Sequence, residues 1–320
     1  MGRRKSRGCS NGGPAALHLL TVVAPRRREG SSPTGIVGRS LARQLIAAGD
    51  RVRVLAEPEM SHDWPSSVEV VKGSVASPAD LAQAWLGVET LFLAGADPET
   101  VPHVLTLAVA SQLQRIVLLS SHGPEYEEAY PPDTWYWLAI ERAVQQSGIP
   151  TTVVRPSAVM GSMIEGTYPA TGSDWPASIR TEGVVREPFA REGHYPFIHE
   201  EDLAAVAAAA LRSDAYVGQV LEAVGPPLST RSRVDSIAAA IGRTIDLLEV
   251  TPELARTSWR ERGWPDGAIE VTLYALEEYG ARRAELARWT LDQRPTVSDI
   301  IGRRPRSYND WAKEHCHLFR

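Results

Sequence analysis

The chain of 320 residues is poor in the features that build disulfide-stapled, membrane-spanning or nucleic-acid-binding proteins. Its two cysteines, Cys9 and Cys316, lie at opposite ends and exclude a disulfide framework, which favours a reducing compartment. No uninterrupted apolar run approaches the roughly 18 residues of a membrane span. The net charge of −5 argues against a general nucleic-acid surface. We therefore expect a cytoplasmic globular protein that binds neither membrane nor nucleic acid.

Motifs for metal ions and for mononucleotide phosphates are missing too. The stretch His199-Glu200-Glu201-Asp202 lacks the second histidine of a zinc-protease helix, so Asp202 is expected to cap or open a helix. His315-Cys316-His317 is expected to be an exposed tail rather than a zinc site. Gly30-x4-Gly35 is followed by Ile36, where a P-loop requires lysine. We predict no metal ion.

Short apolar runs alternate with helical patterns through the first half of the chain. The runs are β-branched and do not alternate with polar residues, which is typical of strands buried on both faces of a parallel sheet. Predicted strands cover residues 19–24, 52–55, 68–71, 90–94, 116–119 and 151–154, and predicted helices cover 35–48, 78–86, 99–110 and 137–146. This order predicts an α/β fold with a doubly wound parallel sheet, whose ligands bind beyond the carboxyl ends of the strands.

The pattern changes after residue 156. Residues 161–197 hold Gly, Pro, Tyr and Trp with little periodicity, which suggests a lid or substrate wall. Helices are predicted at 200–211, 231–241, 252–262, 268–289 and 309–315, and strands at 220–223 and 245–250. We divide the chain into a disordered basic tail (1–16), a Rossmann-like dinucleotide-binding core (17–156), and a smaller α/β substrate-binding part with the C-terminal helices, integrated with the core (157–320).

The glycine turn before the first predicted helix is the strongest functional signal. Thr34-Gly35-Ile36-Val37-Gly38 opens an amphipathic helix, and Gly49 follows its last residue as a C-terminal cap would. A helix N-terminus carries free N–H groups and a partial positive charge, and small residues let a phosphate approach the backbone. The turn therefore predicts a site for the pyrophosphate of a dinucleotide.

Several stretches together resemble the NmrA-like, atypical short-chain dehydrogenase/reductase family over roughly residues 15–320. They are Thr34-Gly35-Ile36-Val37-Gly38-Arg39, Ala48-Gly49-Asp50-Arg51-Val52-Arg53-Val54-Leu55, Leu118-Leu119-Ser120-Ser121, Ile140-Glu141-Arg142-Ala143, Ser147-Gly148-Ile149-Pro150, Val154-Arg155-Pro156 and Ile301-Gly302-Arg303-Arg304-Pro305-Arg306-Ser307-Tyr308 with Trp311-Ala312. The resemblance implies the Rossmann fold and an NAD(P)-binding site. The contacts it implies for the cofactor are Thr34, Gly35, Ile36, Val37, Gly38, Glu57, Ser74, Ala94, Gly95 and Ser120.

Three departures from the family pattern bear on the cofactor. The turn reads Ser32-Pro33-Thr34-Gly35 where the family has Gly-Ala-Thr-Gly, and Ser74 stands where the family often has aspartate. Glu57 follows the second strand, where relatives that use NADPH tend to place arginine. An acidic group there suits a ribose 2′-hydroxyl and repels a 2′-phosphate, which favours NAD(H) over NADP(H). The alternatives are that Glu57 is a plain surface residue and that no cofactor binds.

The usual acid of short-chain dehydrogenases, Tyr-x-x-x-Lys, is absent. Only three of the 34 basic residues are lysines, and Val68 and Asn309 stand four residues before Lys72 and Lys313. Candidate proton donors follow the fifth strand instead: Ser120, Ser121 and His122, then Tyr126, Tyr130 and Tyr136.

We select Tyr136, Glu141 and Ser121 as catalytic candidates, with Tyr136 preferred as the acid because it lies where the usual tyrosine helix begins. For Tyr136 the alternative is an aromatic lid with Trp135 and Trp137. For Glu141 the alternative is a structural partner.

The aromatic residues of 156–198 are expected to contact a small, partly apolar substrate, and we select Tyr168, Trp175 and Phe197. Three functions remain open. The first is an NAD(P)H-dependent oxidoreductase, for instance in specialised metabolism. The second is a cofactor-independent isomerase, dehydratase or cyclase on a degenerate fold. The third is an NAD(P)-sensing regulator with a protein partner. A monomer or a homodimer is expected in each case.

Overall fold

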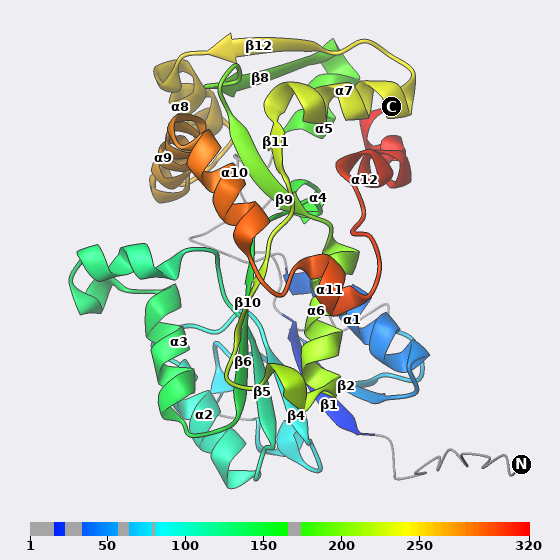
Figure 1. Cartoon of the computed structure of the whole chain (residues 1–320), viewed down its shortest axis with the longest axis vertical. Helices are drawn as coiled ribbons and strands as arrows, with labels where there is room; N and C mark the ends of the chain where they lie inside the picture. Colours follow the sequence, from blue (N-terminus) through cyan, green and yellow to red (C-terminus); the bar gives the residue numbers. More distant parts are fainter. Residues whose placement is uncertain (1–15, 23–33, 57–63, 79–80, 166–173) are drawn as a thin grey trace, which may run out of the picture.

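The structure, a computed structural model, describes residues 16–22, 34–56, 64–78, 81–165 and 174–320. Its core is a seven-stranded sheet in the order β10-β6-β5-β4-β1-β2-β3, with every neighbouring pair parallel (Figure 1). The strands are β1 (Leu17–Val22), β2 (Arg51–Ala56), β3 (Glu69–Lys72), β4 (Thr90–Leu93), β5 (Arg115–Leu119), β6 (Thr151–Pro156) and β10 (Val220–Ala223). The predicted doubly wound parallel sheet is confirmed.

Helices cover both faces of this sheet. One face packs against α1 (Thr34–Ala47), α6 (Glu200–Arg212) and α11 (Val297–Ile301), and the other against α2 (Val101–Ala110), α3 (Trp137–Gln146) and the 3₁₀ turn Ala82–Trp85. The consecutive residues Leu19 and Leu20 of β1 are both fully buried, the first on the α2/α3 side and the second on the α1/α6 side. This explains why β1 reads as an apolar run rather than as an alternating one.

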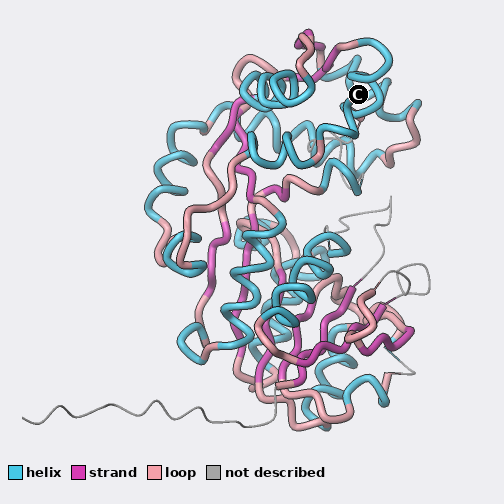
Figure 2. The backbone as a smooth tube through the Cα atoms, turned by 90° about the vertical axis from the view of Figure 1, so that its right-hand side faces the viewer, coloured by secondary structure: helices cyan, strands magenta, loops and turns pink. Residues whose placement is uncertain are grey.

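A second lobe lies beyond the carboxyl edge of the sheet (Figures 1 and 2). It contains a three-stranded sheet and a two-stranded sheet, formed by β7 (Ala158–Val159), β9 (His194–Ile198) and β11 (Pro227–Ser229), and by β8 (Val184–Pro188) and β12 (Asp246–Val250). Its helices are α4 (Ser162–Glu165), α5 (Trp175–Glu182), α7 (Thr230–Ile241), α8 (Pro252–Glu261), α9 (Asp266–Ala281), α10 (Arg283–Asp292) and α12 (Tyr308–Glu314).

The two halves of the chain share the central sheet. β10 comes from the second half, yet it pairs with β6 and forms one edge of the core. Just after β10, a Cβ atom on Gly225 would lie 1.7 Å from the carbonyl oxygen of Phe197 on β9. The N–H of Gly225 donates to Oγ of Ser157, 3.2 Å away. The end of β10 is thereby held against the start of the second lobe.

The structure corrects three expectations about secondary structure. Residues 161–197 contain α5, β8 and β9, whose signals are weak because the strands Val-Val-Arg-Glu-Pro and His-Tyr-Pro-Phe-Ile both carry proline. The single helix expected at 268–289 is two helices that meet at Arg282, where ψ is 15°. The helix expected at 78–86 is a 3₁₀ turn in its described part. The predicted basic tail lies outside the described residues, save for its last residue.

None of the helices within the described ranges has both the length and the apolar character needed to cross a membrane.

Candidate active site

The N-terminus of α1 lies at the carboxyl edge of the sheet, next to β1. Gly35, Val37 and Gly38 are buried there, and Ile36 is half-buried. A Cβ atom on Gly161, after β7, would lie 3.1 Å from Cδ1 of Ile36, so the second lobe packs against this turn. The helix begins at Thr34, and the residues just before it lie outside the described part of the chain.

The end of β4 is fixed beside β1 by one side chain. Oγ1 of Thr21 donates to the carbonyl of Ala94 and accepts from its N–H, each at 2.7 Å. Gly95 follows with φ of 68°, a conformation that favours glycine. The strand order reverses between β1 and β4, and sheets of this kind bind dinucleotides in the crevice outside the carboxyl ends of the strands at such a switch point. Glycines, a helix N-terminus and the small residues Ala94 and Gly95 fit such a cofactor.

One further predicted cofactor contact, Ser74, follows β3 and is held by local contacts. Oγ of Ser74 accepts from the N–H of Ala76 at 3.3 Å, and Ser74 forms a bridge with Ser77. Glu57 lies outside the described residues.

A buried ion pair supports the end of β5. Arg155 on β6 binds Glu141 on α3 through two hydrogen bonds, Nε to Oε1 at 3.0 Å and Nη2 to Oε2 at 2.7 Å. Oγ of Ser120 donates to Oε1 of the same carboxylate at 2.5 Å. Glu141 is only 2 % exposed. Both of its oxygens are engaged, which matches the structural alternative for Glu141; a part in chemistry stays a prediction.

Arg155 continues this network toward the cavity. Its Nη1 donates to Glu125 and, at 3.4 Å, to Oε1 of Glu222 on β10. Burial opposes the charge of Arg155, but its hydrogen bonds to Glu141 and Glu125 outweigh burial and raise its pKa. Oε2 of Glu222 lies 3.5 Å from Nδ1 of His122. A continuous chain of polar contacts thus leads from Ser120 through Glu141, Arg155 and Glu222 to His122.

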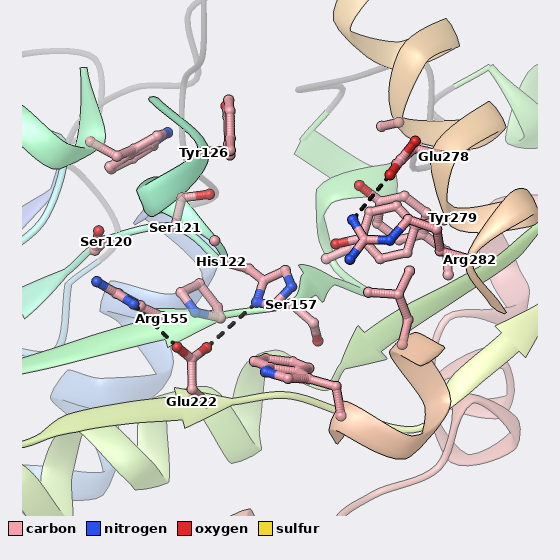
Figure 3. Close-up of a pocket in the computed structure, with 18 of the residues that line it drawn as sticks. Ser120, Ser121, His122, Tyr126, Arg155, Ser157, Glu222, Glu278, Tyr279 and Arg282 are labelled. Carbon is pink, nitrogen blue, oxygen red and sulfur yellow. Dashed lines mark hydrogen bonds and ion pairs between the residues drawn. The ribbon is translucent and has the colours of Figure 1, made fainter. Parts of the chain in front are cut away.

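All of these residues except Glu141 border a cavity of about 680 Å³ between the two lobes. Figure 3 shows residues from the sheet edge on one side and Glu278, Tyr279 and Arg282 of the α9/α10 region on the other. The lining includes Ser120, Ser121, His122, Tyr126, Trp137, Arg155, Ser157, Tyr195, Glu222, Tyr274, Tyr279, Leu286 and Trp289. The cavity therefore has aromatic walls with a few charged groups, an arrangement typical of small-molecule sites.

The far wall carries its own ion pairs. Arg282 binds Glu278 through Nη1 at 3.0 Å and Glu285 through Nη2 at 2.5 Å. Burial, followed by the neighbouring Tyr195, raises the pKa of Tyr279 well above its usual value, so this phenol keeps its proton at neutral pH. Sequence reasoning missed this wall, because residues on α9 and α10 carry no motif and are more than 100 positions from Ser120.

Tyr136, the preferred acid, lies at the N-terminus of α3, and the cavity lining does not include it. Its hydroxyl donates to the carbonyl of Ala96, just after β4, at 3.1 Å. Burial, and then the charge of Asp97, raise the pKa of Tyr136. The carboxylate of Glu127 accepts from the N–H of residues 136, 137 and 138 at 2.9–3.1 Å and so caps α3. Tyr136 is thus near the expected nicotinamide region, and its role as the acid stays a prediction.

Two of the three predicted substrate residues, Trp175 and Phe197, fall in the core of the second lobe. Trp175 and Phe197 are nearly fully buried, and the guanidinium of Arg233 lies between their rings, 4.2 and 4.5 Å from the centroids. Neither borders the cavity, whereas Tyr195, two residues before Phe197, does. Tyr168 lies outside the described residues. Of the three catalytic candidates, only Ser121 lines the cavity.

A metal site finds no support: no group of three His, Cys, Asp or Glu side chains in the part of the chain that the structure describes could hold an ion.

The fold, with a glycine turn at its switch point, is that of a nucleotide-binding α/β protein of the Rossmann type. Residues 33–214 match the NAD(P)H-binding family, and the chain belongs to this family. The chain is 32 % identical over 293 residues to the (4-alkanoyl-5-oxo-2,5-dihydrofuran-3-yl)methyl phosphate reductase of Streptomyces griseus, covering 89 % of this chain and 96 % of that protein.

Two solved structures share the fold. Citrobacter sp. triphenylmethane reductase complexed with NADP(H) superposes with a TM-score of 0.68 at 16 % identity, over 93 % of this chain and 99 % of that one. NmrA, a negative transcriptional regulator, superposes with a TM-score of 0.65 at 15 % identity, over 95 % and 96 %. The predicted NmrA-like resemblance is confirmed.

Proposed function

We propose that this NAD(P)H-dependent oxidoreductase reduces a small molecule in which a carbon–carbon double bond is conjugated to a carbonyl group. A similar protein is named as a reductase of a furanone phosphate, and the 5-oxo-2,5-dihydrofuran ring in that name holds a carbon–carbon double bond conjugated to a carbonyl group. The proposal depends mainly on one observation, the aromatic cavity that meets the sheet edge at Ser120 and Ser121. Flat conjugated rings pack well against such walls.

The chain's own residues would hold the cofactor at the crevice next to this cavity. The N-terminus of α1 with Gly35 and Gly38 suits the pyrophosphate. Ala94 and Gly95 follow β4, and Ser120 follows β5 and lines the cavity, which supports them as further cofactor contacts. When bound, the nicotinamide supplies a hydride. The aromatic walls exclude water from the acceptor, and the Glu141–Arg155 pair holds the segment from Ser120 to His122 in place.

Two finer points belong to the same proposal. The acidic Glu57, about 20 residues after the glycine turn, supports NAD(H) over NADP(H). Without a Tyr-x-x-x-Lys pair, the proton must come from another group of the cavity.

The test measures the oxidation of NADH and NADPH from the fall in their absorbance. Three classes of acceptor are compared: a butenolide, a quinone and a saturated ketone. We expect turnover with the conjugated acceptors and little with the ketone. Mass spectrometry should find deuterium from a 4-deuterated cofactor in the product. Fluorescence titration that detects no binding of either cofactor at millimolar concentration would refute the proposal, as would product formation without cofactor.

Cofactor preference is measured separately, from the dissociation constants of NADH and NADPH. We expect tighter binding of NADH, and Glu57→Gln should narrow the difference. Equal constants in the unchanged protein would contradict the role of Glu57.

A further inference from the structure

We propose that His122, oriented by Glu222, is the catalytic acid that delivers a proton to the substrate, and this inference rests on the proposed function. The two residues reach the cavity from different parts of the chain. His122 follows β5 in the first half, and Glu222 is on β10 in the second. The ring of His122 lines the cavity, with Nδ1 3.5 Å from Oε2 of Glu222 (Figure 3). Hydrogen bonds of this kind are often long before substrate binds.

The other contacts of His122 leave its second nitrogen available. The ring stacks on Trp289 of α10, with 4.5 Å between the centroids. Among the described residues, Nε2 has no hydrogen-bond partner, and it is not sealed from the cavity. A histidine whose Nδ1–H faces a carboxylate presents Nε2 to the substrate, which is the orientation that acid–base catalysis requires.

Glu222 is itself fixed by a cation. Its Oε1 accepts from Nη1 of Arg155, whose other nitrogens bind the buried Glu141. Glu222 can therefore face His122 without turning away to solvent. The charged groups that share the cavity with His122 are Glu125, Arg155, Glu222, Glu278, Arg282 and Glu285. Four of these six are carboxylates, and each of them pairs with one of the two arginines.

Three other candidate proton donors are either less well placed or less acidic than His122. The hydroxyl of Tyr136 already donates a hydrogen bond to the carbonyl of Ala96, and Tyr136 does not line the cavity. Tyr279 lies on the far wall, and its raised pKa makes it a reluctant donor. Ser121 lines the cavity, but an alcohol is a much weaker acid than an imidazolium.

The proton transfer balances as follows. The substrate gains a hydride, and with it two electrons, at one carbon of the conjugated double bond, which leaves an enolate. The Nε2–H bond of the His122 imidazolium breaks and a C–H bond forms at the neighbouring carbon. The neutral imidazole keeps its remaining proton on Nδ1, next to Glu222, and Nε2 is protonated again from water through the cavity mouth.

The first measurement uses the cofactor-free protein. The imidazole ¹⁵N NMR spectrum is recorded at a pH where the histidines are neutral. The signal that His122→Gln removes is assigned to His122, and it should be that of the Nδ1–H tautomer. Glu222→Ala should shift this signal toward the tautomer mixture of a free histidine. An Nε2–H tautomer in the unchanged protein would overturn the proposal.

The second measurement uses turnover. His122→Gln should lower kcat about 100-fold or more and remove one limb of its pH profile, while the dissociation constant of NADH stays unchanged. His103→Gln, at an exposed position of α2, is the matched control and should behave as the unchanged protein. Normal turnover by His122→Gln, or a larger loss of kcat in Tyr279→Phe than in His122→Gln, would overturn the role of His122 as the acid. Either result would leave the proposed function standing. If the unchanged protein reduces no conjugated acceptor, the proposed function fails, and the donor fails with it.

Discussion

Arg155 and Glu141 form a bidentate ion pair that is closed off from solvent between β6 and α3. The carboxylate of Glu141 also accepts a hydrogen bond from Oγ of Ser120. Nη1 of Arg155 takes no part in the pair and donates to Glu125 and Glu222 instead. One buried guanidinium therefore ties the end of β5 to β10. The segment that carries His122 is therefore positioned both by Arg155 and Glu222 in the cavity wall and by Glu141 behind it.

Removing the charge of Glu141 should destabilise the protein strongly. Glu141→Gln leaves Arg155 without its buried partner, and breaking such a pair costs about 3–5 kcal/mol in free energy of unfolding. Glu128, whose pair with Arg142 is half exposed, is the matched control, and Glu128→Gln should cost less than about 1 kcal/mol. Urea denaturation followed by circular dichroism measures both, and equal losses would contradict the structural role of the pair.

Replacing Tyr136 by phenylalanine separates a supporting role from an acid role. The hydroxyl supports the carbonyl of Ala96 after β4, so Tyr136→Phe should lower the free energy of unfolding by about 1 kcal/mol. We expect kcat to fall less than about 10-fold, whereas loss of a general acid costs about 100-fold or more. A fall of that larger size in steady-state kinetics would instead favour Tyr136 as the donor.

Adding a methyl group at Gly225 should disrupt the junction of the lobes. A Cβ there would meet the carbonyl of Phe197, which lies in β9 between its partners β7 and β11. Gly225→Ala should destabilise by about 3 kcal/mol or more, or leave the protein insoluble. Gly267→Ala, in the first turn of α9 where a Cβ meets open space, is the control and should change stability by less than about 1 kcal/mol. Thermal unfolding compares them, and a soluble Gly225→Ala protein with unchanged Tm would refute the close contact.

His18 should make the stability depend on pH below neutrality. Burial lowers the pKa of this side chain on β1, although Asp50 partly offsets the effect. A depressed folded pKa means that the unfolded chain takes up the proton first, so stability is full above about pH 6.5 and falls as pH decreases from there, by up to about 1.4 kcal/mol per pH unit.

Urea denaturation between pH 7.5 and 5 tests the effect of His18. His18→Asn should flatten the dependence, while His103→Asn, at an exposed position, should not. A wild-type slope that persists in His18→Asn would assign the effect to other groups.

The core sheet could be predicted because its signals are local. The apolar runs of β1, β4 and β5 are buried on both faces, and the stripe of Val37, Leu41 and Leu45 on α1 is fully buried. The Gly35 turn was predicted from its own glycine pattern, and the end of β4 and the Ser120–Ser121 segment from strand order and the family resemblance, because the carboxyl ends of parallel strands share one edge.

The cavity could not be predicted in the same way. Its far wall depends on a break at Arg282 and on the packing of two helices that carry no motif. Trp175 and Phe197 were expected to face the substrate because they are aromatic, but Arg233 between their rings makes them a packed core. Glu222 is an ordinary glutamate in the sequence, and only the pairing of β10 with β6 brings it within reach of His122.

The origin of β10 in the second half also limits how relatives of this protein can exchange parts. A recombinant that joined residues 1–156 to a foreign second half would receive a new edge strand and a new carboxylate for His122 together. The backbone of β6 would be left bare if the incoming segment failed to dock, and an unpaired edge invites self-association. Such chimaeras should therefore survive only when the strand and the substrate lobe move as one block.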